Sequence, residues 1–180
     1  QAKGYVDWLD KATATGLRYV FFSEMAPPVP TEPPGTLAAQ NRIYARLGLE
    51  QTQQYVSVTT AARIVKSNPA MLGFERPVDK ALPDFPVVLA IPGKAQVHLA
   101  AEVATRLGAK TAILIATSPG GGYVCDEFTT YYEPNTDKVR WVVNPFAFFK
   151  EAFGEDRFPV PDVTTLSGRR MYFSHIDGDG

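Results

Sequence analysis

The sequence predicts an α/β protein with a three-layer or flavodoxin/Rossmann-like sheet and an additional β-hairpin. Near the N-terminus an amphipathic helical pattern leads into an apolar strand. β-Branched and aromatic runs then recur along the chain, and a second strong helical pattern follows them. The 180 residues are 45% hydrophobic and 12% aromatic, which is typical of an ordered globular protein.

The N-terminal residues predict a helix, a strand and a second helix. Apolar side chains recur at helical spacing over residues 5–15, and Gly16 stands where a left-handed C-terminal cap is usual. The apolar run of residues 17–22 has the length and composition of a buried strand. Thr36 is the expected N-cap of a helix that runs to about Leu47.

Between these elements, residues 26–35 hold five prolines and predict a long loop. The loop would lie at the carboxyl end of the first strand, where α/β folds bind ligands. A ligand-binding module, for carbohydrate, with its site under this loop is therefore one hypothesis for function.

The middle of the chain predicts mainly strands. Residues 99–107 fit a helix and a strand equally well, so both remain open. A β-hairpin is predicted from residues 128–132 and 139–143, which flank a polar turn. The other predicted strands are residues 55–58, 63–65, 86–92, 96–100 and 111–116.

The clearest helix begins after this hairpin, with Asn144 as N-cap and Pro145 at the first helical position. Phe146, Phe149 and Phe153 share one face of it, and Gly154 ends it. Because the chain starts within a helical pattern and stops at a polar strand end, we expect it to be part of something longer.

Composition excludes several classes of protein. The net charge of −1 gives no basic footprint for nucleic acid or for an anionic membrane. The single cysteine excludes an internal disulfide framework and a multi-cysteine zinc site. No apolar run approaches the roughly 20 residues that span a bilayer.

The C-terminal residues carry the sharpest chemical signal. The apolar run of residues 171–176 ends in Asp177-Gly178-Asp179-Gly180. Two carboxylates so close repel each other unless a cation or a shared proton relieves them. One could bind a metal while the other accepts a proton from metal-bound water. A solvated Asp-Gly turn and the start of a calcium loop remain alternatives.

Three segments together resemble the central region of PelA-like proteins, bacterial cell-envelope proteins that modify an exopolysaccharide. They are residues 141–149, residues 158–165 and the run from Gly168 to Gly180. The family carries a glycoside-hydrolase barrel, a middle reductase-like α/β domain and a polysaccharide deacetylase domain. The resemblance implies a middle domain over residues 1–158, a linker over 159–170 and the first deacetylase strand over 171–180.

The resemblance also implies roles for the two aspartates. Polysaccharide deacetylases open with a motif whose first Asp is the catalytic base and whose second binds a divalent metal, zinc. Asp177 then resembles the base and Asp179 the metal ligand, although Gly178 separates them here. The family's two metal-binding histidines lie on a later segment, so we expect these residues alone to be inactive and to need no cofactor.

The implied function is that of a non-catalytic accessory domain in a hydrolase that deacetylates an amino-sugar polymer. Its partners would be that polysaccharide and the adjacent catalytic domains, with no nucleic acid and no membrane span. The family implies a periplasmic or extracellular location and a role in biofilm exopolysaccharide.

A self-contained enzyme is the competing hypothesis. Residues 118–122 hold three glycines after a strand, as a phosphate-binding loop does, although a strand-like run follows them. Cys125, His98 and Glu24 supply the residue types of an amidotransferase-like triad, but the neighbours of Cys125 do not form a nucleophile elbow. Aromatic residues that could stack on sugar rings are Trp8, Trp141, Tyr131 and Tyr132.

Overall fold

A computed structural model of the chain describes residues 2–23, 35–57, 62–105 and 108–154. In chain order the elements are α1 (Ala2–Thr13), β1 (Tyr19–Phe21), α2 (Thr36–Arg46), β2 (Leu49–Val56), β3 (Ala62–Ser67), β4 (Phe85–Ala90), β5 (Gln96–Thr105), β6 (Gly108–Ser118), β7 (Gly121–Val124), the 3-10 helix η1 (Asp126–Phe128), β8 (Thr130–Glu133), β9 (Lys138–Trp141) and α3 (Pro145–Phe153).

The main sheet has five strands in the order β1-β7-β6-β5-β3. Among the described strands, β1 and β7 pair in parallel, whereas the other three pairings of this sheet are antiparallel. The predicted mixed α/β class is therefore confirmed, with a core made mostly of sheet. The flavodoxin- or Rossmann-like layering is not confirmed, because such sheets join parallel strands through crossover helices.

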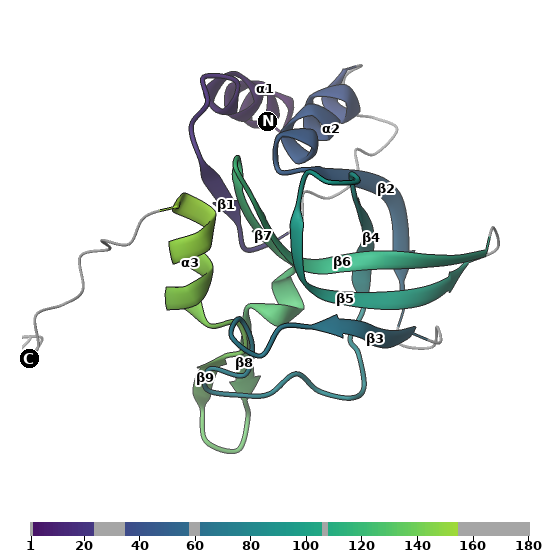
Figure 1. Cartoon of the computed structure of the whole chain (residues 1–180), viewed down its shortest axis with the longest axis vertical. Coiled ribbons are helices and arrows are strands. Elements are labelled where there is room, and N and C mark those ends of the chain that lie inside the picture. The colour runs from purple at the N-terminus through teal and green to yellow at the C-terminus, as the bar shows by residue number, and fades with distance from the viewer. Residues whose placement is uncertain (1, 24–34, 58–61, 106–107, 155–180) are drawn as a thin grey trace, which may run out of the picture.

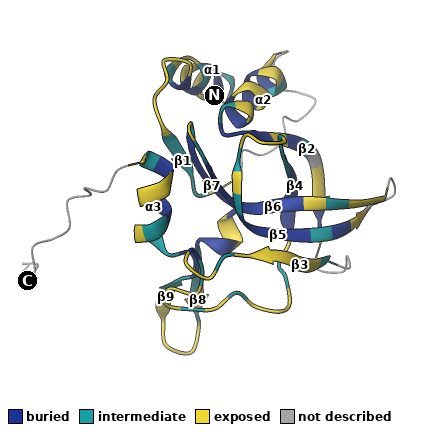
Figure 2. Cartoon of the chain, in the orientation of Figure 1, coloured by how far each residue is buried: buried dark blue, intermediate teal, exposed yellow. Residues whose placement is uncertain are grey.

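A second, two-stranded sheet pairs β2 with β4 in antiparallel fashion, and β4 packs against β6 of the main sheet. In Figure 1 these strands lie beside the long β5–β6 hairpin. The largest core cluster spans both sheets, with Phe85, Leu99, Leu114 and Tyr123 fully buried within it. Figure 2 shows the buried residues concentrated where β4, β5, β6 and β7 come together.

The open question over residues 99–107 is resolved by strand pairing for the residues up to Thr105. β5 has β6 on one side and β3 on the other, so its backbone groups find partners on both edges. Residues 99–101 are all buried, which is typical of a strand covered on both faces. A continuous apolar run of this kind fits a buried helix and a buried strand alike.

The two N-terminal helices pack against each other at one end of the molecule (Figure 1). Their contact buries a small separate cluster that contains Val6 and Ile43, and Asp10 of α1 forms ion pairs with Arg42 and Arg46 of α2. The predicted N-cap of α2 is wrong by one residue. Gly35 occupies that position with a φ of 92°, and the α2 N-terminus has no side-chain cap.

The ends of α3 are those that the sequence predicts. The Asn144 side-chain oxygen accepts a hydrogen bond from the Ala147 N–H at 3.2 Å, and Gly154 ends the helix with a φ of 64°. The face that Phe146, Phe149 and Phe153 share is not the most buried one, because Phe148 is fully buried whereas Phe146 is 64% exposed. The predicted β-hairpin is confirmed as β8 and β9.

Candidate functional site

The three glycines after β6 serve close packing between elements. Gly120 lies in the turn before β7 and Gly121 is the first residue of that strand. A Cβ atom on Gly120 would overlap the Arg46 carbonyl, and one on Gly121 would overlap the Tyr19 carbonyl. A Cβ on Gly122 would lie 2.5 Å from the Phe148 ring of α3. The glycines lead into a strand and not into a helix N-terminus, so this turn lacks the geometry that cradles a phosphate.

His98 forms the most connected polar cluster of the described core. It lies on β5 with no exposed surface. Its Nε2 is 2.8 Å from Thr117 Oγ1 on β6 and 3.1 Å from Glu151 Oε2 on α3. Its Nδ1 is 3.2 Å from Asn68 Nδ2. The cluster therefore joins two strands, a helix and the loop after β3.

The hydrogen bonds fix which nitrogen of His98 carries the proton. Asn68 Oδ1 accepts from the Ala70 N–H at 3.1 Å, so the Asn68 amide nitrogen faces His98 and donates to Nδ1. Because Nδ1 is thereby an acceptor, the proton of the neutral ring resides on Nε2, which donates toward Thr117 and Glu151.

The electrostatic surroundings keep His98 neutral. Burial lowers its pKa, the Glu151 carboxylate opposes this shift, and Lys66 adds to it. Because Nε2 already carries a proton and Nδ1 accepts from Asn68, neither ring nitrogen is free to take a proton from a hydroxyl nucleophile. His98 is therefore a structural hydrogen-bonding residue in this geometry.

Cys125 is 1% exposed and lies between β7 and η1, where its backbone N–H donates to the Leu114 carbonyl at 2.8 Å. Its side chain belongs to the main core cluster. Its burial at 1% exposure is typical of a core cysteine. Glu24, the third residue of the amidotransferase-like hypothesis, lies outside the described residues.

The aromatic residues proposed for sugar stacking differ in their surroundings. Trp8 is 62% exposed on α1, and its ring centroid lies 6.1 Å from that of Tyr5, which is 57% exposed. Trp141 packs edge-on against Phe22, and the Arg76 guanidinium lies 3.4 Å from the centre of the Tyr131 ring. Trp8 is thus the one of these with a broad free surface next to a second exposed ring.

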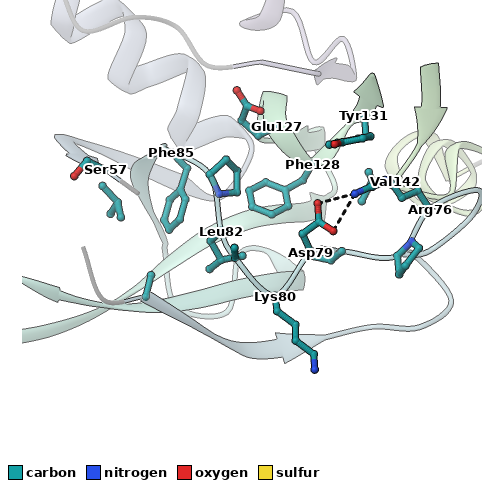
Figure 3. Close-up of a pocket in the computed structure, with 16 residues that line it drawn as sticks. Ser57, Arg76, Asp79, Lys80, Leu82, Phe85, Glu127, Phe128, Tyr131 and Val142 are labelled. Atoms are coloured by element: carbon teal, nitrogen blue, oxygen red, sulfur yellow. Dashed lines mark hydrogen bonds and ion pairs between the residues drawn. The ribbon is translucent and has the colours of Figure 1, made fainter. Parts of the chain in front are cut away.

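A pocket of about 500 Å³ opens between the loop of residues 76–83 and the segment from η1 to β8. Figure 3 shows Phe85 and Phe128 side by side within it, with Leu82 nearby and Tyr131 and Arg76 on one flank. Arg76 Nη2 donates to both carboxylate oxygens of Asp79, at 3.0 and 2.9 Å. No local pattern in the sequence predicts this pocket, because its residues come from segments far apart in the chain and form no motif.

The two aspartates of the C-terminal motif, Asp177 and Asp179, lie outside the described residues. Across residues 2–23, 35–57, 62–105 and 108–154, no group of three or more His, Cys, Asp or Glu side chains could hold a metal ion. None of the helices within these ranges combines the length and hydropathy that crossing a bilayer requires.

Comparison of the chain with protein-family models, with curated proteins and with solved structures finds no match.

Proposed function

We propose that the described residues form a non-catalytic accessory domain of a multidomain enzyme that modifies a cell-envelope polysaccharide. In this proposal the chain belongs to a PelA-like protein, and residues 171–180 begin a deacetylase domain that removes acetyl groups from an amino-sugar polymer. The observation that carries the proposal is Asp177-Gly178-Asp179 directly after an apolar strand-like run.

The chemistry of the two aspartates fits this assignment. Carboxylate oxygens are suitable ligands for a divalent metal, and a metal beside them would relieve their mutual repulsion. Asp179 would hold the metal and Asp177 would act as the base that accepts a proton. When bound, the metal supplies an activated water. The proposal requires two further histidine ligands from residues beyond Gly180.

The described residues support an accessory role through what their reactive groups already do. His98 is fixed by Asn68, Thr117 and Glu151, and the Cys125 side chain is enclosed in the core. Both groups therefore contribute to the packing of the sheet on α3 and η1. The same proposal includes a three-layer or flavodoxin/Rossmann-like arrangement of the domain.

The exposed Tyr5–Trp8 pair supports an additional contact with the polysaccharide. The two rings lie on one face of α1 with an angle of 31° between their planes, which leaves a broad aromatic surface. An aromatic face packs well against the C–H groups of a sugar ring while its polar edge remains in water. We propose this pair as the glycan contact of the domain.

The test is the release of acetate from an acetylated amino-sugar polymer by the chain extended by about 150 residues, a typical domain length. Asp177→Asn should lower kcat at least about 100-fold, the contribution of a general base. Trp8→Ala should raise KM for the polymer roughly two- to tenfold and leave kcat unchanged. Asp7→Asn, which removes an exposed ion pair with Lys3, is the matched control.

Release that needs no metal, or full activity of the Asp177→Asn variant, would contradict the assignment of the motif. An unchanged KM for Trp8→Ala would contradict the glycan contact alone.

A further inference from the structure

We propose that the pocket between residues 76–83 and the η1–β8 segment binds a neutral ring compound that carries one hydroxyl group, such as a cyclic or benzylic alcohol. This inference is independent of the proposed function. It rests on the apolar surface of the pocket, on the balance of its charges, and on a tyrosine hydroxyl that no described residue engages.

The surface that a ligand would contact in this pocket is largely apolar. Phe85 and Phe128 form its base, where their rings meet edge to face with centroids 6.3 Å apart. Val78, Leu82 and Pro83 are half-buried and continue this apolar surface toward the solvent. An apolar ring that packs against these side chains removes them from water, which favours binding. The volume of about 500 Å³ lies within the range of small-molecule sites.

The four charged residues of the described lining balance one another. Arg76 donates two hydrogen bonds to the carboxylate of Asp79, at 3.0 and 2.9 Å, so this pair contributes no net charge. Lys80 and Glu127 carry opposite charges, and in Figure 3 both side chains extend away from the aromatic rings. A charged ligand packed against the apolar surface would lose hydration without gaining an ion pair. The pocket therefore favours a neutral molecule.

Tyr131 places a hydroxyl group on the flank of this apolar surface. The Arg76 guanidinium lies 3.4 Å from the centre of the Tyr131 ring and covers one of its faces. In Figure 3 the hydroxyl end of the ring is directed toward Phe128. Among the described residues, none forms a hydrogen bond with this hydroxyl. A ligand hydroxyl beside it can therefore donate to it or accept from it.

These features together define the ligand class. The ring of the ligand packs on the apolar surface, and its hydroxyl pairs with that of Tyr131. A carboxylate or an ammonium group at the same position would be partly desolvated with no counter-charge beside it. A ring without a polar group would leave the Tyr131 hydroxyl without a partner in the bound state.

The experiment compares three ligands of nearly the same shape: benzyl alcohol, benzylamine, which is an ammonium ion at pH 7, and benzoate. Each is titrated into the isotopically labelled 180-residue chain while ¹H–¹⁵N spectra record the backbone amides. Benzyl alcohol should shift the amides of Ala81, Phe128 and Tyr131 with a Kd of roughly 5 mM, which is typical of a fragment with eight heavy atoms. Benzylamine and benzoate should each bind at least about fivefold more weakly.

Two variants on the same strand make the result specific. Tyr131→Phe keeps the ring under Arg76 and removes the hydroxyl, so it should weaken the binding of benzyl alcohol about three- to tenfold. Tyr132→Phe is the matched control, because its hydroxyl donates to Asp137 at 2.9 Å and lies outside the pocket lining. This control should leave the affinity unchanged.

The proposal is overturned if benzyl alcohol shifts none of these amides up to about 50 mM, a limit roughly tenfold above the expected Kd. It is also overturned if either charged compound binds as tightly as the alcohol. Equal affinity of the Tyr131→Phe and Tyr132→Phe variants for benzyl alcohol would overturn it as well.

Discussion

Lowering the pH from 7.5 to 5.5 should destabilise this domain through His98. The side chain has no exposed surface, and burial is the main reason that its pKa lies below the usual value. In the unfolded chain the same ring takes up a proton near pH 6.5. Between that pH and the lower folded-state pKa, the unfolded chain therefore binds more protons than the folded one.

The sign and the size of the effect follow from this difference. The contribution of His98 to stability is fully present above about pH 6.5 and is lost as the pH falls toward its folded-state pKa. One proton limits the slope to about 1.4 kcal/mol per pH unit. Glu151 at 3.1 Å reduces the loss, whereas Lys66 increases it.

Urea unfolding at half-unit steps of pH measures this slope. The change in unfolding free energy between pH 7 and pH 5.5 should disappear in the His98→Gln variant. In the Glu151→Gln variant the decrease should continue to lower pH, because this change removes the carboxylate that favours the protonated ring. A wild-type free energy of unfolding that stays constant or rises on acidification would refute the assignment. An equal slope in the His98→Gln variant would refute it as well.

Two further predictions concern backbone geometry. Gly121→Ala should lower the free energy of unfolding by about 3 kcal/mol, because Gly121 has a φ of 133° and its new Cβ would overlap the Tyr19 carbonyl. The control Gly4→Ala, in an open position of α1, should instead raise it by about 0.5–1 kcal/mol. Equal effects of the two variants in urea unfolding would contradict the close-packing role of Gly121. Asn144→Ala should lower the free energy of unfolding by about 1 kcal/mol through loss of the α3 N-cap, whereas Asn144→Asp keeps an accepting oxygen and should lower it less. Thermal unfolding that ranks the two variants the other way would be inconsistent with this cap.

Local patterns predict those parts of the fold that depend on neighbouring residues. Asn144 and Pro145 mark the start of α3 because capping acts within one turn, and Gly16 and Gly154 adopt the positive φ expected of C-terminal caps. The β8–β9 hairpin follows from two short strands around a polar turn. Each of these features depends on a few adjacent residues.

Features that depend on distant parts of the chain are not predictable in this way. The sheet order brings β1 beside β7, about 100 residues later, and no local pattern encodes that pairing. The buried face of α3 centres on Phe148 because Gly122 leaves room for its ring, so the packing partner and not the helical period alone selects the face. The pocket around Phe85 and Phe128 likewise joins segments that are distant in the chain, so no local pattern predicts it.

Comparing kcat for acetate release between Asp177→Asn and Cys125→Ala in the extended chain shows where the chemistry lies. Our account places the chemistry at the C-terminal aspartates and gives the buried Cys125 a packing role. It predicts a loss of at least about 100-fold for the first variant and a change within about twofold for the second. Loss of activity on removal of the Cys125 thiol, with Asp177→Asn unaffected, would contradict it.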